Sequence, residues 1–165
     1  MKRAREVKTA GQWDGANAVD TITLDAHERH RRRVVLSAER GTRFLLDLPQ
    51  ATALHDGDGL VLDDGAIIRV VGRPEPLAEI AAADAHALAR LAWHIGNRHI
   101  DVEIAGDRLR IRRDHVIEDM LRGLGAGLLH IDAPFNPEPG AYGHQGHEHN
   151  HGHDHRHDHH DRDDG

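Results

Sequence analysis

Short apolar stretches separated by turn-forming residues run through the first 73 residues of the chain. The apolar or alternating stretches lie at residues 21–24, 34–36, 44–48 and 67–71. Gly, Pro and Asp residues mark turns between them, at residues 39–41, 49, 56–59 and 63–65. Short strands at this spacing are typical of a small sheet or barrel. The pattern therefore predicts a β-rich N-terminal domain over residues 1–73.

A different pattern begins after residues 72–76, whose Gly and Pro content predicts a linker. Residues 77–82 fit a strand. Asp84 can cap a following helix because its carboxylate accepts hydrogen bonds from unpaired backbone N–H groups. Gly96 suits the left-handed position at the end of that helix. The helix carries one apolar stripe at i, i+3, i+4 and i+7 spacing, formed by Leu88, Leu91, Ala92 and Ile95.

The rest of this region repeats the same elements. Residues 100–104 and 109–111 alternate around a turn at Gly106 and predict a hairpin. A second helix, capped by Asp114, has its apolar stripe at Ile117, Met120, Leu121 and Leu124. A last strand follows at residues 128–131, so the order is βαββαβ, the split unit of ferredoxin-like folds. The sequence predicts an α+β protein whose second domain, residues 75–142, is ferredoxin-like.

The composition removes several classes of chemistry. Cysteine is absent, which excludes disulfides, thiolate metal sites, iron–sulfur clusters and a catalytic Cys. Imidazole, carboxylate and backbone groups remain as metal ligands. The sequence has no GxxxxGK[ST] phosphate loop and no clear Ser-His-Asp or paired-carboxylate motif, so we predict that the protein is not an enzyme.

Charge and hydropathy limit the partners and the location. The formal net charge is −7 with neutral histidines and aromatic residues are 3%, which argues against nucleic acid. No apolar run reaches the roughly 20 residues that cross a bilayer. Residues 1–8 are charged and lack the apolar segment of a secretory signal. We expect a cytoplasmic protein that binds neither nucleic acid nor membrane.

Histidine is the strongest compositional signal. The chain has 17 histidines, and nine lie between His144 and His160. Pro, Gly, His and Asp dominate from Asn136 onward, which predicts disorder, with residues 143–165 as a distinct tail. The tail histidines, mostly in His-x-His repeats, are His144, His147, His149, His151, His153, His155, His157, His159 and His160.

The chemistry of this tail favours metal binding. Imidazole suits nickel, copper and zinc, and Asp154 and Asp158 add carboxylates that offset the charge of a cation. The alternatives are a purification tag or a solvated low-complexity end, but a tag is normally an unbroken histidine run. A flexible segment cannot hold the fixed geometry that catalysis needs, so storage or delivery is the expected role. Protons compete for imidazole near pH ~6.5, so binding should weaken as the pH falls toward ~6.

Two histidines of the second domain are further candidates. His99 follows the first predicted helix, and His115 follows Asp114 at the start of the second. Spacing alone favours a surface or capping role for His99 and, for His115, a residue of the first helical turn with no ligand role. The isolated histidines His27, His55, His86 and His130, and also His94, are expected to be surface or packing residues.

A family resemblance strengthens these two candidates. Residues 93–99, which end in Gly96–Asn97–Arg98–His99, and residues 109–121, which contain Asp114–His115, resemble the UreE family of urease accessory proteins. The β-rich start and the histidine-rich end fit the layout of that family. Some members have His-Asp-His where this chain has Arg113–Asp114–His115, so any accessory site there lacks its first histidine.

The resemblance implies a nickel metallochaperone. Members of the family form homodimers through the ferredoxin-like domain. Each subunit contributes the histidine that matches His99, and the two histidines bind Ni(II) at the interface. The N-terminal domain is thought to bind a peptide or partner protein. The partners implied are the urease accessory GTPase and the complex of urease apoprotein with its accessory proteins. Zn(II) or Cu(II) can substitute at imidazole sites.

Two rival functions and one charged segment stay open. A store or buffer for nickel, zinc or copper explains the tail equally well. An enzyme with His99 and His115 as its metal centre needs a third fixed ligand, for which the sequence offers no clear candidate. Residues 29–33, Arg-His-Arg-Arg-Arg, are expected to form a solvated loop or an edge strand protected by charge. The alternative for that segment is a patch for an acidic partner surface.

Overall fold

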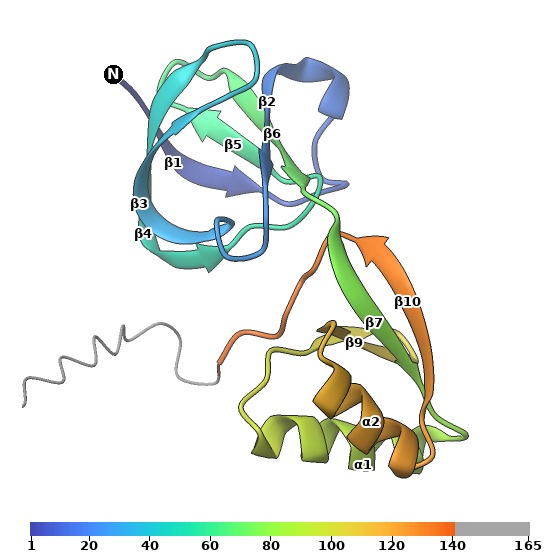
Figure 1. Cartoon of the computed structure of the whole chain (residues 1–165). Coiled ribbons are helices and arrows are strands. Elements are labelled where there is room, and N and C mark those ends of the chain that lie inside the picture. Colours follow the sequence, from blue (N-terminus) through green and yellow to red (C-terminus); the bar gives the residue numbers. More distant parts are fainter. Residues whose placement is uncertain (141–165) are drawn as a thin grey trace, which may run out of the picture.

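The structure is a computed structural model and describes residues 1–140. It has two β-sheets, one in each half of the chain, and both helices belong to the second half (Figure 1). The architecture is therefore α+β, as predicted. Neither helix of residues 1–140 is long and apolar enough to cross a membrane.

The N-terminal domain is a curled six-stranded sheet (Figure 1). Its strands are β1 (Lys2–Lys8), β2 (Ala18–Leu24), β3 (His30–Ser37), β4 (Arg43–Ala53), β5 (Gly59–Leu62) and β6 (Ile67–Gly72), in the order β2-β6-β5-β1-β4-β3. A short 3₁₀ turn, η1 (Gly15–Asn17), precedes β2. Two of the neighbouring pairs, β1 with β4 and β2 with β6, are parallel.

Alternation along these strands builds the core of this domain. In β4, Phe44, Leu46 and Leu48 are buried, whereas Leu45 and Asp47 lie on the other face. A strand places successive side chains on opposite faces, so the buried set points into the curl of the sheet. The sequence pattern missed β1 and β5 as separate strands, because β1 is mostly charged and buries only Ala4 among its seven residues.

The C-terminal domain has the predicted element order βαββαβ. Its elements are β7 (Glu75–Ala81), α1 (Ala85–Asn97), β8 (Glu103–Ala105), β9 (Arg108–Arg112), α2 (His115–Gly123) and β10 (Gly127–Ala133). The sheet order is β10-β7-β9-β8, and every neighbouring pair is antiparallel. Leu91 and Ile95 of α1, with Ile117 and Leu121 of α2, pack on the apolar face of this sheet. These are members of the two stripes predicted from the sequence.

Both helix starts follow the prediction, but the end of α1 does not. The Asp84 carboxylate accepts a hydrogen bond from the Ala87 amide, at 2.7 Å, and the Asp114 carboxylate caps α2 in the same manner. Gly96 was expected to adopt the left-handed conformation, but it lies inside α1. His99 takes that conformation instead, with φ of 54°. The helix therefore extends two residues beyond its last apolar residue, Ile95, and ends at Asn97.

The two domains are joined more tightly than the predicted linker implies. β6 ends at Gly72 and β7 begins at Glu75, so only residues 73 and 74 connect the two sheets. Within residues 136–140, expected to be disordered, the Asn136 side-chain oxygen accepts from Arg29 at 2.8 Å and the Glu138 amide donates to the Val102 carbonyl at 2.8 Å. The predicted tail, residues 143–165, and its nine histidines lie outside the described residues.

Candidate metal site

His99 lies just beyond the C-terminal end of α1, which ends at Asn97 with Arg98 as its cap. Its amide donates to the Gly96 carbonyl at 3.1 Å, and the backbone then turns into the left-handed region. Residues other than glycine adopt that region rarely, although histidine does so more often than most. The turn takes the His99 side chain off the path of the helix, where it is exposed to solvent.

The elements on both sides fix this position. Ile95, fully buried, anchors the last turn of α1 in the domain core. The Arg98 side chain reaches across to α2 and contacts the Met120 sulfur at 2.9 Å. His99 therefore combines an exposed ring with a backbone that follows a packed helix. Such support is what a site needs if it is to present a ligand in a reproducible place.

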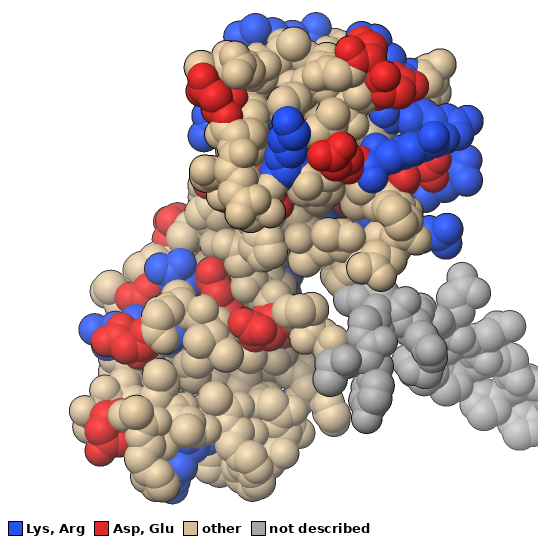
Figure 2. All heavy atoms as spheres, turned by 180° about the vertical axis from the view of Figure 1, so that it is seen from behind, with Lys and Arg blue, Asp and Glu red and all other residues tan. Residues whose placement is uncertain are grey.

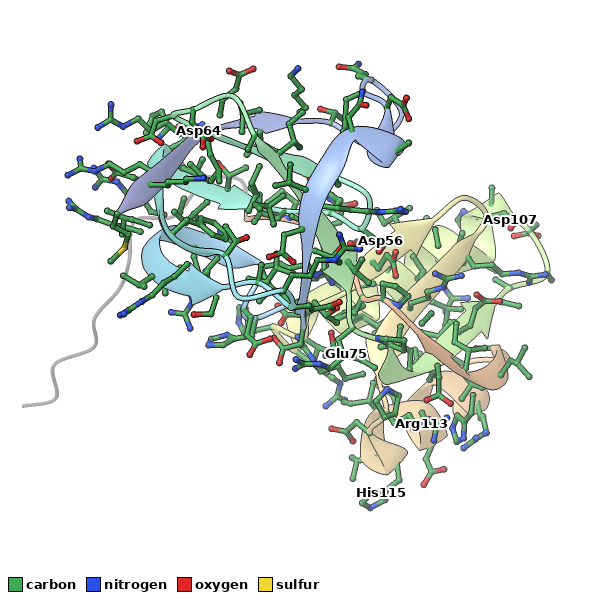
Figure 3. All side chains as sticks on the ribbon, turned by 90° about the horizontal axis from the view of Figure 1, so that it is seen from above. Asp56, Asp64, Glu75, Asp107, Arg113 and His115 are labelled. Atoms are coloured by element: carbon green, nitrogen blue, oxygen red, sulfur yellow. The ribbon has the colours of Figure 1, made fainter. Side chains whose placement is uncertain are left out.

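His115 is the first residue of α2 and is also exposed. It lies at the periphery of the C-terminal domain in Figure 3, where its ring projects outward from the helix end. The preceding Asp114 carboxylate is engaged in capping, because it accepts from the amides of Val116 and Ile117 at 3.0 and 3.2 Å. The Oδ1 oxygen of Asp114 therefore serves the helix cap next to His115.

No complete metal site exists within one copy of the described chain. Residues 1–140 contain no group of three or more His, Asp or Glu side chains able to hold an ion. His99 and His115 belong to different helix ends, and neither ring makes a hydrogen bond or ion pair within this part of the protein. A lone imidazole is an incomplete site, since metal ions in proteins take several ligands. A metal ion at either histidine would need further ligands from elsewhere.

Apolar residues are exposed close to these two histidines in the sequence. Trp93 on α1 is 64% exposed and Val116 on α2 is 60% exposed. His94, predicted to be structural, packs edge-on against the Trp93 ring with 5.0 Å between ring centres. Trp93 also lines a shallow depression with His86, Ala89, Arg90 and His94. Trp93 is the large apolar side chain exposed at this depression, and exposed apolar surface beside a hollow is a feature of partner-binding sites.

His130 has a partner that the sequence pattern did not reveal. Its Nε2 contacts the Glu118 Oε1 oxygen, and the other Glu118 oxygen accepts from the Asp114 amide at 3.0 Å. Burial raises the pKa of Glu118, but the hydrogen bonds from His130 and the Asp114 amide and the charges of His130 and Arg122 outweigh it. The net pKa is therefore below the ordinary value. A glutamate soon after the Asp114 cap was an available signal for the Asp114–Glu118 bond, because a carboxylate there can return a bond to the cap.

Three more histidines meet at the boundary between the domains. His27, His30 and His55 line a cavity of about 190 Å³ together with Asp101 and Arg112 of the C-terminal domain. His27 Nε2 lies 3.4 Å from an Arg31 nitrogen, and His55 lies 3.9 Å from Asp58. These histidines make local contacts and form no metal cluster within residues 1–140. His27 and His55, predicted to be isolated, therefore line a common cavity but are not part of a metal cluster in this part of the chain.

The basic segment 29–33 divides into two parts. Arg31, Arg32 and Arg33 are exposed on β3, at one end of the sheet order, which agrees with a charge-protected edge strand. Figure 2 shows Lys and Arg gathered on one side of this domain. Arg29, by contrast, is only 2% exposed. The expectation of a solvated residue is wrong for Arg29, because its guanidinium satisfies buried carbonyl groups of both domains.

Comparisons with known proteins cover nearly the whole chain. Residues 2–72 match the family model described as UreE urease accessory protein, N-terminal domain, and residues 75–160 match its C-terminal domain. A urease accessory protein UreE from Bradyrhizobium sp. (strain ORS 278) is 54% identical over 149 residues, which is 90% of this chain and 70% of that protein. Proteins of the same description from Chelativorans sp. (strain BNC1) and Rhodobacter capsulatus are 57% and 47% identical, over 80% and 90% of this chain and 85% and 94% of their own lengths.

Proposed function

Because the chain belongs to the UreE family of urease accessory proteins, we propose that its part in urease maturation is to bind Ni(II) and deliver it to the forming active site. This is the role of an accessory chaperone and involves no catalysis. Nickel is the cargo, and imidazole is a suitable ligand for it. The proposed ligands are His99, with His115 as an accessory, and the nine tail histidines.

One observation carries this proposal: His99 is exposed on a rigid helix end and no other His, Asp or Glu completes a site around it in residues 1–140. In a homodimer with a two-fold axis near this residue, each chain supplies the same imidazole, and two incomplete sites become one chelate. The exposed Trp93 and Val116 support such an interface, since dimer formation removes apolar surface from water.

Two protein ligands suit delivery better than a closed set of four. Structural zinc sites are four-coordinate and closed, whereas a site with open positions can exchange its ligands. A partner can therefore take the ion by supplying ligands at the open positions. The partners proposed are the urease accessory GTPase and the urease apoprotein complex, in the cytoplasm. The GTP-binding step belongs to that partner, because this sequence has no phosphate loop.

The second candidate function is storage or buffering of nickel, zinc or copper. The nine tail histidines favour it, because they offer many ligands that need no fixed geometry. A pure buffer needs the tail alone, whereas a delivery protein needs the folded site. Urease activation at ample nickel separates the two, with a full-length chain whose tail histidines are all replaced by Ser. Delivery predicts that activation persists with this variant and falls when the protein is left out, whereas buffering predicts the same activation with and without it.

The main test is nickel calorimetry on the full chain with His99→Ala. Loss of outer partners of a ligand alone costs about 10–100-fold in metal affinity. We therefore expect His99→Ala to weaken the tightest site at least tenfold, while most of the tail capacity survives. His27→Ala, an exposed histidine in the other domain, is the matched control and should change nothing. Unchanged tight binding in His99→Ala, or an assembled dimer with the two His99 rings far apart, would overturn the proposal.

A further inference from the structure

The outer surface of the N-terminal sheet is strongly basic where β1, β4 and β3 lie side by side. The buried residues of these strands point into the core, and their neighbours along each strand point outward, because successive side chains alternate. Five charged side chains of this outward set, here called the basic face, are Arg3 and Arg5 of β1, Arg33 of β3, and Arg43 and Asp47 of β4. Four arginines and one aspartate give the basic face a formal charge of +3, whereas the whole chain has −7. Lys and Arg gather on this side of the domain in Figure 2.

Asp47 is the one carboxylate of the basic face, and three arginines share it. Its oxygens lie 3.6 Å from an Arg3 nitrogen, 3.7 Å from an Arg5 nitrogen and 3.8 Å from an Arg33 nitrogen. These distances are too long for hydrogen bonds, so the ion pairs leave the N–H donors of the guanidinium groups unused by Asp47. The side chains of Arg5 and Arg33 are 64% and 63% exposed. Their donors therefore face solvent.

The sheet of the C-terminal domain has the opposite balance of charge. Arg110 of β9 lies between Glu79 and Glu103, at 3.0 and 3.7 Å, and Arg112 likewise pairs with two carboxylates. Each of these arginines has two acidic partners, whereas three arginines share one on the basic face. Like charges close together on a sheet destabilise it. Carboxylates from another molecule would relieve that repulsion.

Protection of a sheet edge explains only part of the basic face. β3 is at the end of the sheet order, so Arg33 can discourage pairing with another strand. β1 lies between β5 and β4, and β4 lies between β1 and β3. Arg3, Arg5 and Arg43 therefore belong to interior strands, which have no edge to protect. A further reason is needed for three of the four arginines.

Two apolar side chains lie among the arginines. Val35 of β3 is 43% exposed and is the register partner of the half-buried Leu45 on β4, which in turn pairs with Arg3 of β1. Arginine beside apolar contact area is typical of protein–protein interfaces. Nucleic acid fits this surface less well, because none of these side chains is an aromatic ring for bases to stack on and the chain as a whole is acidic.

We propose that the basic face binds a carboxylate-rich segment of a partner protein, whose acidic side chains pair with the arginines that share Asp47. Arginine binds carboxylates through two parallel hydrogen bonds, and complementary charge speeds the encounter of two proteins. The basic face belongs to the domain that carries neither His99 nor His115. The interaction is therefore separate from the proposed nickel site and requires no bound metal.

The test is fluorescence anisotropy with the full-length protein at low ionic strength. The probe is a labelled peptide in which glutamates flank a pair of leucines, and a second peptide has Gln in place of each Glu. Arg5→Ala combined with Arg33→Ala should weaken binding of the acidic peptide about tenfold, since two surface ion pairs are lost. Arg40→Ala combined with Arg69→Ala removes the same charge from exposed positions outside the basic face and is the matched control. Its effect should stay within about two-fold.

Asp47→Asn should change binding in the opposite direction. It removes the carboxylate that competes with the peptide for three arginines, so we expect binding about three-fold tighter. Circular dichroism shows whether each variant is folded. If the double arginine variant is not folded, the Asp47→Asn result decides the case alone.

Several outcomes would contradict the inference. These are equal weakening in the control pair, weaker binding by Asp47→Asn, or equal binding of the Gln peptide. Tighter binding of an oligo-dT with the same net charge would assign the basic face to nucleic acid. Self-association in analytical ultracentrifugation that the double arginine variant abolishes would assign it to a second copy of this chain. Nickel affinity at His99 should be the same in every variant, so failure of the inference would leave the proposed function intact.

Discussion

The buried carboxylates of the N-terminal domain and the two candidate histidines of the C-terminal domain differ in both burial and hydrogen bonding. Asp20 and Asp58 are 2% and 4% exposed, and each accepts hydrogen bonds from backbone amides on both of its oxygens. His99 and His115 are exposed, and within residues 1–140 their rings make no such bonds. A polar group that stabilises a fold is buried with all its partners. The two histidines proposed as metal ligands are instead left with their ring nitrogens open to other partners.

The largest expected effect breaks the first half of this comparison. The Asp20 carboxylate accepts from the amides of Thr21, Arg40 and Thr42 at 2.8–3.1 Å, so it fixes the turn between β3 and β4. Hydrogen bonds to charged groups contribute about 1.5–3 kcal/mol each, and they are not additive. We expect Asp20→Ala to lower the free energy of unfolding by about 3 kcal/mol, measured by urea denaturation, with unchanged nickel affinity at the His99 site.

Asp107→Ala is the control for that experiment, because the Asp107 side chain is 91% exposed and has only a distant ion pair with Arg108. Its effect on unfolding should stay within about 0.5 kcal/mol. A stable Asp20→Ala protein with weakened nickel binding would show that the carboxylate serves the metal site rather than the turn. The distinction between buried carboxylates that stabilise the fold and exposed histidines that bind metal would then be wrong.

The second prediction concerns acid pH and sharpens the comparison within the C-terminal domain. Glu118 has a folded pKa below its ordinary value, so its charged form stabilises the fold above pH ~4.5 and this contribution is lost as the pH falls through the folded pKa. Glu118→Gln should therefore lower the free energy of unfolding by about 1 kcal/mol near pH 7, with the difference from wild type shrinking below pH ~4.5.

Asp20 contributes with the same sign. Burial raises the pKa of Asp20, but hydrogen bonds from Thr42, Arg40 and Thr21 outweigh this and lower it to about 2. Its contribution is present above pH ~4 and is lost toward pH 2. Denaturation series from pH 7 to 2 therefore place the loss from Glu118 at a higher pH than the end of the loss from Asp20. Asp107→Asn should leave the whole curve unchanged, and a Glu118→Gln difference that grows in acid would reverse the assignment.

The sequence predicted features that depend on neighbouring residues, and it missed contacts between residues far apart in the chain. The apolar stripe of α1 and the caps at Asp84 and Asp114 are local, so periodicity and a short polar side chain are enough to find them. Arg29 was grouped with its charged neighbours, because nothing local distinguishes a buried arginine. Its partners at residues 135 and 136 lie more than 100 positions away.

The same distinction between local and long-range features explains which residues of the candidate site were predicted. His99 and His115 were found through a family resemblance in contiguous residues, and the structure gives their exposure and the helix ends that hold them. The Glu118–His130 pair joins α2 to β10 and was missed, since it depends on how a helix packs beside a strand. Gly96 was misassigned because the helix continues through Gly96 to Asn97 and its cap, Arg98, contacts Met120 of α2, which the local sequence does not show.

The smallest expected effect tests whether the two exposed histidines are equivalent. His115 begins α2, and the partial positive charge at a helix N-terminus disfavours a cation there. His99 follows a C-terminal helix end, where a cation is favoured. We expect His115→Ala to weaken nickel binding at the folded site by less than about three-fold, against at least tenfold for His99→Ala. Calorimetry on full-length chains with serine in place of the tail histidines measures this without the tail background.

Arg113→His in the same background gives the complementary result. It restores the His-Asp-His sequence at the start of α2, and the long Arg113 contact that it removes, at 3.4 Å to the Leu77 carbonyl, contributes little to stability. Two histidines flanking Asp114 should add one weak nickel ion per chain, which appears as an increase in stoichiometry without a change in the tightest affinity. If His115→Ala weakened the tightest site as much as His99→Ala, the two helix ends would form one site in the assembled protein, and the distinction between a primary and an accessory ligand would fall.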